Sequence, residues 1–212
     1  MKFDKNQLLL YAVTDQSWVG RQTLYEQVED ALKGGVTLVQ LREKTLDEDA
    51  FIREAIQIKE LCQHYHVPLI INDNLKVAQK SEADGIHVGI EDAPIAKIRQ
   101  SMPDDFIIGA TCKTVEQALA AQKAGADYMG VGAVFPSPTK NQAIRITVEQ
   151  LKKICSCVTI PAVAIGGIGR HNIMEIKGGG MSGIAVVSAI FAAEDIQSAA
   201  ARLKTKATEV VG

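Results

Sequence analysis

Short apolar runs rich in β-branched residues recur along the 212-residue chain, and more polar segments separate them. Each run has the length of a buried β-strand. We expect eight strands, at residues 8–13, 36–41, 68–71, 85–88, 106–110, 128–132, 161–165 and 183–187. Between them, apolar residues at three- and four-residue spacings indicate one-faced helices. The clearest of these helices span residues 47–64, 93–99, 115–124, 148–154 and 196–204.

The strict alternation of strand and helix predicts a parallel sheet that is covered on both sides. No linker or change of composition interrupts the series, so we expect one domain over residues 1–212. Polar residues concentrate just after the strands. An open eight-stranded sheet would spread them over more than ~30 Å, whereas a closed barrel brings them to one rim. The sequence therefore predicts an α/β fold, a single (β/α)8 or TIM barrel, with its chemistry at the carboxyl ends of the strands.

Composition and charge narrow the function classes. Hydrophobic residues make up 47% of the chain, which excludes a disordered protein. The net charge of -2 and the pI of about 6.1 provide no basic field, so we expect neither nucleic acid nor an anionic membrane as a partner. The sequence shows no signal-peptide pattern and no run near the ~20 apolar residues of a membrane span. We expect a cytoplasmic protein. The sequence does not determine its oligomeric state, and a homo-oligomer is one possibility.

Turns of glycine and small residues follow the last two expected strands. Gly166 and Gly167 follow the seventh strand, and Val187 and Ser188 follow the eighth. Backbone N–H groups in such turns commonly bind phosphate at this position in barrels. The alternative is that the glycines only permit a tight turn. Their position after strands seven and eight favours phosphate binding.

Polar and apolar side chains alternate in the segment Gln40-Leu41-Arg42-Glu43-Lys44, which continues the second expected strand. Strand periodicity places its first, third and fifth residues on the same side. Both cations, Arg42 and Lys44, are therefore expected to face the barrel axis. A forked guanidinium suits a polyphosphate, and an ammonium adds a second positive charge. The alternative is a charged turn that is exposed to solvent. We consider this weaker, because strand periodicity directs both cations toward the barrel axis.

Two acidic residues follow neighbouring strands. Asp73, preceded by Asn72, follows the third strand, and Asp92 follows the fourth. Two carboxylates at one rim, near the expected cations, fit Mg²⁺, which takes its other ligands from water and phosphate oxygens. Each acid alone also fits the N-cap of the helix that follows it. We favour the metal site because capping would have to explain both residues.

Two further features contribute to the expected rim. The segment after the sixth strand, residues 132–140, contains two prolines and presents Ser137, Thr139 and Lys140. Two hydroxyls and an ammonium suit a phosphorylated ligand, although a generic surface turn would have a similar composition. His87 lies inside the fourth expected strand, and we interpret it as a packed or rim histidine rather than a catalytic base.

Six motifs occur in order at the expected strand ends: Gln40-Leu-Arg-Glu-Lys44, Ile-Asn72-Asp73, Gly85-Ile-His-Val-Gly-Ile-Glu-Asp92, Pro136-Ser-Pro-Thr-Lys140, Ile-Gly-Gly-Ile168 and Val-Val-Ser188-Ala-Ile. Together they resemble the thiamine-phosphate synthase family over nearly the whole chain. The resemblance implies a TIM-barrel transferase of thiamine biosynthesis that depends on Mg²⁺. Such an enzyme joins 4-amino-2-methyl-5-hydroxymethylpyrimidine pyrophosphate to 4-methyl-5-(2-phosphoethyl)thiazole and releases thiamine phosphate and pyrophosphate.

The resemblance also implies roles for individual residues. Arg42, Lys44 and Lys140 would be catalytic, because they neutralise charge on the departing pyrophosphate, and Asp73 and Asp92 would bind Mg²⁺. The pyrimidine pyrophosphate would contact Gln40, Leu41, Arg42, Glu43, Lys44, Asn72, Thr111 and Lys140. The thiazole phosphate would contact Ser137, Pro138, Thr139, Gly167, Val187 and Ser188.

The chain departs from the residues usual in this family at four positions. Thr111 stands in place of serine and Ser137 in place of threonine, so both keep a hydroxyl. Asn74 stands in place of arginine and Ile90 in place of glutamine, so both lose polar contacts. These last two departures concern secondary contacts and leave the expected metal ligands and cations in place.

Three rival functions remain to be weighed. A thiazole tautomerase-like relative would lose part of the pyrophosphate and metal set, and a non-catalytic regulator would need a single phosphate site. An isomerase of phosphorylated sugars or anthranilates would need an acid and a base around one carbon. The synthase interpretation is favoured because the chain keeps the whole charged set: Arg42, Lys44, Asp73, Asp92 and Lys140.

Overall fold

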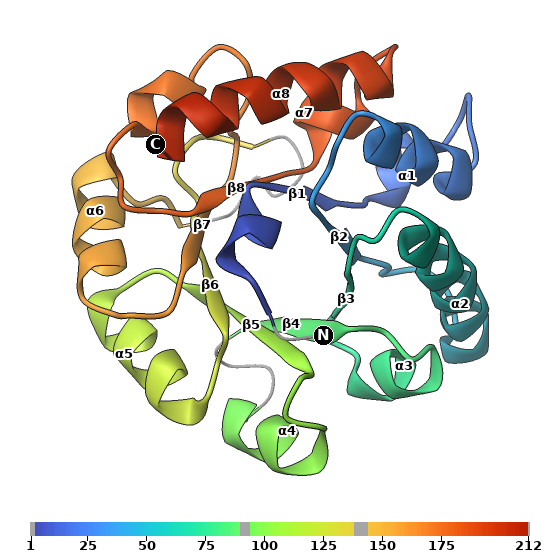
Figure 1. Ribbon diagram of the computed structural model, residues 1–212, viewed down its shortest axis with the longest axis horizontal. Coiled ribbons are helices and arrows are strands. Elements are labelled where there is room, and N and C mark those ends of the chain that lie inside the picture. Colours follow the sequence, from blue (N-terminus) through green and yellow to red (C-terminus); the bar gives the residue numbers. More distant parts are fainter. Residues whose placement is uncertain (1–2, 90–93, 138–143, 212) are drawn as a thin grey trace.

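The computed structural model describes residues 3–89, 94–137 and 144–211, and in these residues eight parallel strands close into a barrel. Strands that are consecutive in sequence pair with each other, and β8 pairs with β1 to complete the ring (Figure 1). The predicted barrel is confirmed, and each strand end lies within two residues of its expected place. The strands are β1 (Leu10–Val13), β2 (Leu38–Leu41), β3 (Leu69–Asn72), β4 (Gly85–Gly89), β5 (Ile107–Cys112), β6 (Tyr128–Gly132), β7 (Ala162–Ile165) and β8 (Gly183–Val186).

Helices surround the ring of strands and cover its outer face (Figure 1). The α-helices of the described residues are α1 (Leu24–Lys33), α2 (Glu48–His64), α3 (Leu75–Lys80), α4 (Ile95–Ser101), α5 (Val115–Ala124), α6 (Val148–Ser156), α7 (Ser188–Phe191) and α8 (Ile196–Val211). Short 3-10 helices occur at η1 (Lys5–Leu8), η2 (Gln16–Trp18) and η3 (Ile173–Ile176). Between β7 and β8 the chain forms η3 instead of a long helix, and Gly178 and Gly180 follow it with left-handed backbone.

Short-range sequence signals set where several helices begin and end. Asp47 caps α2 by accepting a hydrogen bond from the Ala50 N–H at 2.8 Å. Thr147 and Gln150 form a reciprocal capping box at the start of α6. Gly125 ends α5 in the left-handed conformation, with φ of 96°, which glycine adopts without a Cβ penalty. The ends of these helices are therefore set by capping side chains and by a glycine that is adjacent in the sequence.

The strands separate two apolar regions. Because successive strand residues point to opposite faces, Leu10 and Ala12 of β1 pack outward against the helices, whereas Tyr11 and Val13 point into the barrel. The same alternation continues around the ring. Tyr11 and Tyr128 are the largest fully buried side chains and fill the barrel interior. The interior is a packed core toward the amino ends of the strands, and it opens into a cavity toward their carboxyl ends.

The amino end of the barrel is covered by the segment that precedes β1. Phe3 stacks on Tyr128 with 5.7 Å between ring centroids, and η1 lies across the opening of the ring (Figure 1). Three side chains just before even-numbered strands also accept a hydrogen bond from a backbone N–H of the strand before. These contacts join Thr37 to Leu10 (2.9 Å), Asp84 to Leu69 (2.8 Å) and Asp127 to Ile108 (2.7 Å).

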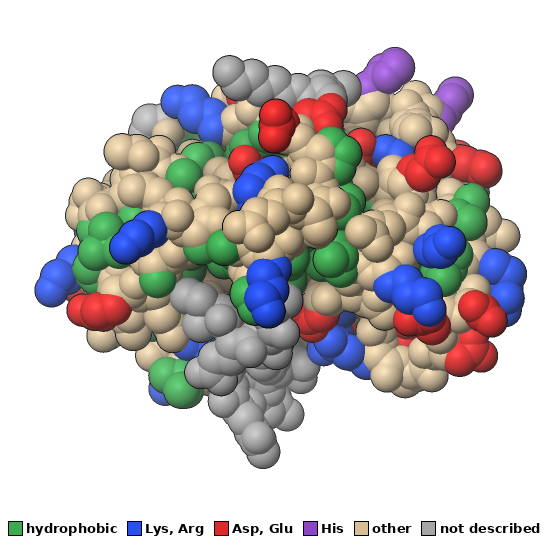
Figure 2. Space-filling view, turned by 90° about the horizontal axis from the view of Figure 1, so that it is seen from below, with side chains coloured by type: hydrophobic (Ala, Val, Ile, Leu, Met, Phe, Trp, Pro, Cys, Tyr) green, Lys and Arg blue, Asp and Glu red, His purple; other side chains and the backbone are tan. Residues whose placement is uncertain are grey.

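The described surface carries charges of both signs. Figure 2 shows Lys and Arg side chains interspersed with Asp and Glu over the face in view, with apolar atoms scattered among them. Among the described residues, no helix combines the length and apolar character that crossing a bilayer requires.

Candidate active site

A cavity of about 200 Å³ lies at the carboxyl ends of the strands. All eight strands or the turns that follow them contribute to its wall, which is the arrangement expected of a barrel active site. Eight residues predicted from the sequence to bind substrate line it: Gln40, Arg42, Asn72, Thr111, Ser137, Gly167, Val187 and Ser188. Residues from distant parts of the chain, expected to serve two different phosphorylated ligands, thus meet at one cavity.

Other predicted residues lie beside the cavity or outside the described chain. The Leu41 side chain is fully buried between strands and helices, and the Glu43 carboxylate binds the following loop. Lys44 and Asp73 pair with each other at 2.9 Å, and neither lines the cavity. Four predicted residues and one departure from the family pattern lie outside the described residues: Asp92, Pro138, Thr139, Lys140 and Ile90.

Arg42 is held at the cavity wall by a buried carboxylate. Its Nη1 lies 2.5 Å from Oδ2 of Asp15, which is 7% exposed, and its backbone N–H donates to the Thr14 hydroxyl at 3.0 Å. Asp15 also accepts the Ser17 N–H at 3.0 Å, so its own position is fixed. The guanidinium is therefore oriented before any ligand arrives. Asp15 was not among the site residues predicted from the sequence, although the pair Thr14-Asp15 directly after β1 was an available signal.

Glu43 organises the loop that carries Lys44. Its Oε1 accepts hydrogen bonds from three successive N–H groups, those of Lys44 (2.6 Å), Thr45 (2.5 Å) and Leu46 (3.2 Å), and from the Thr45 hydroxyl (2.8 Å). Burial by itself would raise the pKa of Glu43, but the hydrogen bonds, led by those from Thr45, lower it below its ordinary value. The carboxylate is thus charged at neutral pH and holds the start of the β2–α2 loop.

Asp73 is not the cap of the helix that follows it. The α3 N-cap is Asn74, whose Oδ1 accepts the Val77 N–H at 3.0 Å. Asp73 itself has left-handed backbone, with φ of 60°, and its N–H donates to the His87 carbonyl at 2.9 Å. The capping alternative for Asp73 is therefore excluded, and its carboxylate is available to Lys44 and to ligands at the rim.

A largely buried hydrogen-bond chain forms part of the cavity floor. It joins Gln40, Tyr11, Tyr128, His87 and Thr111 through contacts of 2.6–3.0 Å. Burial raises the pKa values of both tyrosines and lowers the pKa of His87 to about 4. The chain is therefore uncharged at neutral pH. His87 is the packed histidine that the sequence indicated, but its position in this chain was not foreseen.

Two glycines after β7 allow two loops to approach each other closely. Gly166 and Gly167 have φ of 98° and 63°, in the left-handed region. A Cβ on Gly167 would lie 2.1 Å from the Pro136 carbonyl oxygen, and one on Gly166 would lie 2.4 Å from the Ala133 Cβ. The Asn172 amide braces the turn by donating to the Gly167 carbonyl at 2.9 Å. Only glycine fits both positions, so the turn presents bare backbone to the cavity.

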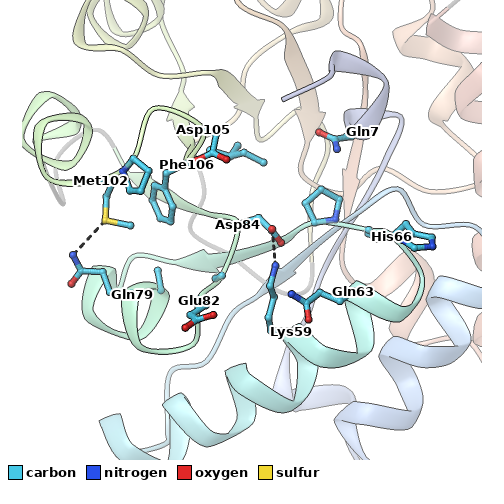
Figure 3. Close-up of a pocket in the computed structure, with 16 residues that line it drawn as sticks. Gln7, Lys59, Gln63, His66, Gln79, Glu82, Asp84, Met102, Asp105 and Phe106 are labelled. Carbon is cyan, nitrogen blue, oxygen red and sulfur yellow. Dashed lines mark hydrogen bonds and ion pairs between the residues drawn. The ribbon is translucent and has the colours of Figure 1, made fainter. Parts of the chain in front are cut away.

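A larger hollow, of about 460 Å³, lies at the opposite end of the barrel (Figure 3). Two of its charged groups bind each other: Lys59, which is 8% exposed, pairs with Asp84 at 2.6 Å, and Asp84 also accepts the Leu69 N–H. None of the residues predicted from the sequence lines it. Size alone would favour this hollow, but its chemistry and its position at the amino ends of the strands favour a structural role.

Comparisons with known proteins identify relatives that cover nearly the whole chain. A family model described as thiamine monophosphate synthase matches residues 10–190. A thiamine-phosphate synthase from Ruminiclostridium cellulolyticum is 48% identical over 92% of this chain and 92% of that protein, and one from Fusobacterium nucleatum is 44% identical over 90% and 92%. A solved thiamine phosphate pyrophosphorylase from Pyrococcus furiosus superposes with a TM-score of 0.90 at 38% identity, covering 98% of this chain and 99% of that one.

Proposed function

The chain belongs to the thiamine monophosphate synthase family, and we propose that it joins 4-amino-2-methyl-5-hydroxymethylpyrimidine pyrophosphate to 4-methyl-5-(2-phosphoethyl)thiazole, giving thiamine phosphate and pyrophosphate. The observation that carries this proposal is the single cavity lined by residues of both expected subsites. Arg42, Asn72 and Thr111 stand on one part of its wall, and Gly167 and Ser188 on another.

The proposed chemistry suits these residues. Pyrophosphate leaves from a methylene group whose developing cation the aminopyrimidine ring stabilises, so the protein needs no covalent nucleophile. Its task is to neutralise charge on the leaving group, and we assign this to Arg42, Lys44 and Lys140. Asp15 holds the Arg42 guanidinium in place, so little reorganisation is required during the reaction.

The second substrate is the nucleophile. We assign its phosphate to the turns after β7 and β8, where Gly167 and Ser188 meet the cavity, together with Ser137, Pro138 and Thr139. Anchoring the phosphate fixes where the thiazole nitrogen lies relative to the pyrimidine methylene.

The residues present fit a magnesium ion. Asp73 does not cap α3, and it presents a partly exposed carboxylate beside Lys44. Mg²⁺ needs only one or two protein carboxylates when phosphate oxygens supply further ligands. We propose that Asp73 and Asp92 hold it. When bound, the ion would supply positive charge to the departing pyrophosphate.

A coupled assay tests this function. Purified protein, given both precursors and Mg²⁺, should release pyrophosphate and form thiamine phosphate in equal amounts, and neither precursor alone should give product. Absence of product with both precursors would refute the proposal. Product without the thiazole phosphate would instead indicate simple hydrolysis of the pyrimidine pyrophosphate.

Paired variants test the metal ligand. Asp73→Asn should raise the Mg²⁺ concentration needed for half-maximal rate by at least about tenfold. The neighbouring variant Asn74→Ala should lose the α3 cap, at a cost of about 1 kcal/mol of stability, and keep the wild-type Mg²⁺ requirement. Equal Mg²⁺ requirements in the two variants would show that Asp73 does not hold the ion.

A further inference from the structure

A hydrogen-bond chain crosses the barrel interior from β2 to β5, strands on different sides of the ring (Figure 1). The Gln40 Nε2 donates to the Tyr11 hydroxyl at 2.6 Å, and the hydroxyls of Tyr11 and Tyr128 lie 2.7 Å apart. Nδ1 of His87 lies 3.0 Å from the Tyr128 hydroxyl, and its Nε2 lies 3.0 Å from the Thr111 hydroxyl. Gln40, Tyr11, His87 and Thr111 line the cavity, whereas Tyr128, which joins the two halves of the hydrogen-bond chain, is fully buried beneath it.

The sequence reserves space for this chain with two glycines. A Cβ on Gly109 of β5 would lie 2.4 Å from the Tyr128 hydroxyl oxygen and 2.5 Å from Nδ1 of His87. A Cβ on Gly130 of β6 would lie 3.2 Å from Cε1 of His87. Any larger residue at position 109 would occupy the place where the tyrosine and the histidine meet. The contact between them is therefore built into the barrel rather than incidental.

One assignment of the hydrogens gives every hydroxyl hydrogen an acceptor among these contacts. In it Tyr11, which accepts from Gln40, donates its single hydrogen to Tyr128. Tyr128 in turn donates to Nδ1 of His87. A neutral imidazole that accepts at Nδ1 carries its hydrogen on Nε2, which donates to the Thr111 oxygen. The Thr111 hydrogen is thus left for the cavity.

We propose that Tyr11, Tyr128 and His87 are positioning residues that fix the hydrogen-bonding pattern of the pyrimidine subsite. This inference rests on the proposed function and deepens it. We call the hydrogen-bond chain from Gln40 to Thr111 the relay. It makes the Thr111 hydroxyl a donor toward the ligand. It also leaves Oε1 of Gln40 as an acceptor that faces the cavity. Tyr128 does not line the cavity, and Tyr11 and His87, which do, act by holding Gln40 and Thr111 in place through their hydrogen bonds.

The proposed pattern defines which pyrimidine is recognised. A 4-amino group donates and suits an amide oxygen, whereas a 4-oxo group accepts and would face another acceptor. A site built to pair one donor rejects an analogue that lacks it, since a buried polar group is then left unpaired. The relay therefore selects the aminopyrimidine over its 4-oxo analogue.

The first test observes the relay without any substrate. In ¹⁵N-labelled wild-type protein at neutral pH, two-dimensional correlation of ring nitrogens and carbon-bound protons should show His87 as a neutral ring with its hydrogen on Nε2. The signal is assigned by its loss in His87→Gln. A hydrogen on Nδ1, or a mixture of the two tautomers, would overturn the proposal.

The second test cuts the relay at its centre. Tyr128→Phe removes the hydroxyl that donates to Nδ1, so the His87 tautomers should mix and the affinity for the pyrimidine pyrophosphate with Mg²⁺ should fall by about fivefold or more. Tyr65→Phe, which removes a hydroxyl 3.4 Å from Glu29 on the outer helices, is the matched control and should change neither. An unchanged His87 signal in Tyr128→Phe would overturn the relay.

Variants at the end of the relay cover the case in which Tyr128→Phe does not fold. Thr111→Val, which removes the hydroxyl at nearly constant volume, should bind the pyrimidine pyrophosphate about tenfold more weakly. Thr111→Ser, which keeps the hydroxyl, should restore binding to within about threefold of wild type. Equal binding by the two variants would show that no hydroxyl donor is used there.

The third test measures selectivity by calorimetry. Wild-type protein should bind the 4-amino pyrimidine pyrophosphate at least about tenfold more tightly than the 4-oxo analogue, and Tyr128→Phe should narrow this ratio to about threefold. An undiminished ratio in Tyr128→Phe would overturn the proposal. If neither compound binds the wild type, the proposed function fails, while the His87 tautomer still decides whether the relay exists.

Discussion

The two ends of the barrel are built from similar residues and use them differently. At the amino end, Asp127 pairs with Arg99 at 2.5 Å and also accepts the Ile108 N–H. At the carboxyl end, Arg42 pairs with Asp15 at the same distance, but the arginine lines a cavity. In the first case both partners are used to hold strands and loops together. In the second, one partner orients the other toward a ligand.

Structural and functional polar groups in this barrel therefore differ in whether their partners are all within the protein or include a ligand. At the amino end, side chains just before the even-numbered strands cap strand N–H groups, so their hydrogen-bonding capacity is used within the protein. At the carboxyl end, Asp15, Glu43 and the tyrosines direct their neighbours. We therefore expect substitutions at the amino end to lower stability with little effect on turnover, and substitutions of residues that line the carboxyl-end cavity to lower turnover.

The largest effect is expected at Arg42. Arg42→Ala should lower kcat/KM for pyrophosphate release by about 10²- to 10³-fold, because a charge-stabilising donor is lost. It also leaves the buried Asp15 carboxylate without its cation, so the melting temperature should fall.

Adding Asp15→Asn separates the two consequences. The double variant Asp15→Asn/Arg42→Ala removes the unpaired charge and should recover most of the melting temperature, but none of the turnover. Steady-state kinetics and thermal unfolding measured on the same samples decide the matter. Recovery of turnover in the double variant would mean that Arg42 serves the fold and not the substrate.

The second effect is expected at the amino end. Asp127→Ala removes both the Arg99 pair and the acceptor for the Ile108 N–H, and should lower the free energy of unfolding by about 2 kcal/mol. For a domain of this size, the melting temperature should fall by roughly 4–8 °C. At 25 °C, kcat/KM should stay within about twofold of wild type. Asp104→Ala, at an exposed position, serves as the control. A large loss of turnover in Asp127→Ala would contradict the assignment of a purely structural role to the amino end.

A third prediction concerns the glycine turn after β7. Gly167→Ala should raise the KM for the thiazole phosphate about tenfold, because its Cβ would collide with the Pro136 carbonyl and displace the turn. Gly178→Ala is a matched control: its φ of 72° imposes the same left-handed strain, but nothing lies within 4 Å of its Cβ. The left-handed backbone should cost each variant about 1 kcal/mol of stability, and Gly167→Ala should lose more because of the collision. A raised KM in both would attribute the effect to strain rather than to crowding.

The sequence predicted the strands better than the helices. Strand runs such as residues 128–132 are short, apolar and bounded by turn residues, so their ends were clear. Three of the described helices, α1, α3 and the four-residue α7, were not among the clearest segments. α3 has six residues, fewer than two turns, so it shows little periodicity. α1 does bury Leu24, Val28 and Leu32 on one face, so the signal was present and went unused.

The candidate site was predicted in its polar groups but not in how they are oriented. Arg42, Asn72 and Thr111 could be found because parallel strands bring their carboxyl ends together. Asp15 and the contact between His87 and Tyr128 could not be found in the same way. These contacts join residues 27 and 41 positions apart through side-chain geometry, and no local pattern encodes them.

The smallest effect concerns Glu43, whose carboxylate holds the loop that carries Lys44. Since the pKa of Glu43 is lower in the folded protein than in the unfolded chain, the unfolded chain binds more protons between the two values. The charged carboxylate therefore stabilises the fold above about pH 5, and this contribution is lost as the pH falls through the lowered pKa.

Glu43→Gln tests this assignment at the carboxyl end. The variant should be about 1 kcal/mol less stable than wild type at pH 7, because charged hydrogen bonds to three N–H groups are weakened. The difference should shrink as the pH is lowered, since wild-type Glu43 also becomes neutral. Urea unfolding of both proteins at pH 7, 5 and 4 measures it, with the exposed Glu209→Gln as control. A difference that stays constant over this range would show that the loop depends on the shape of Glu43 and not on its charge, which would remove one of the features that distinguish the carboxyl end.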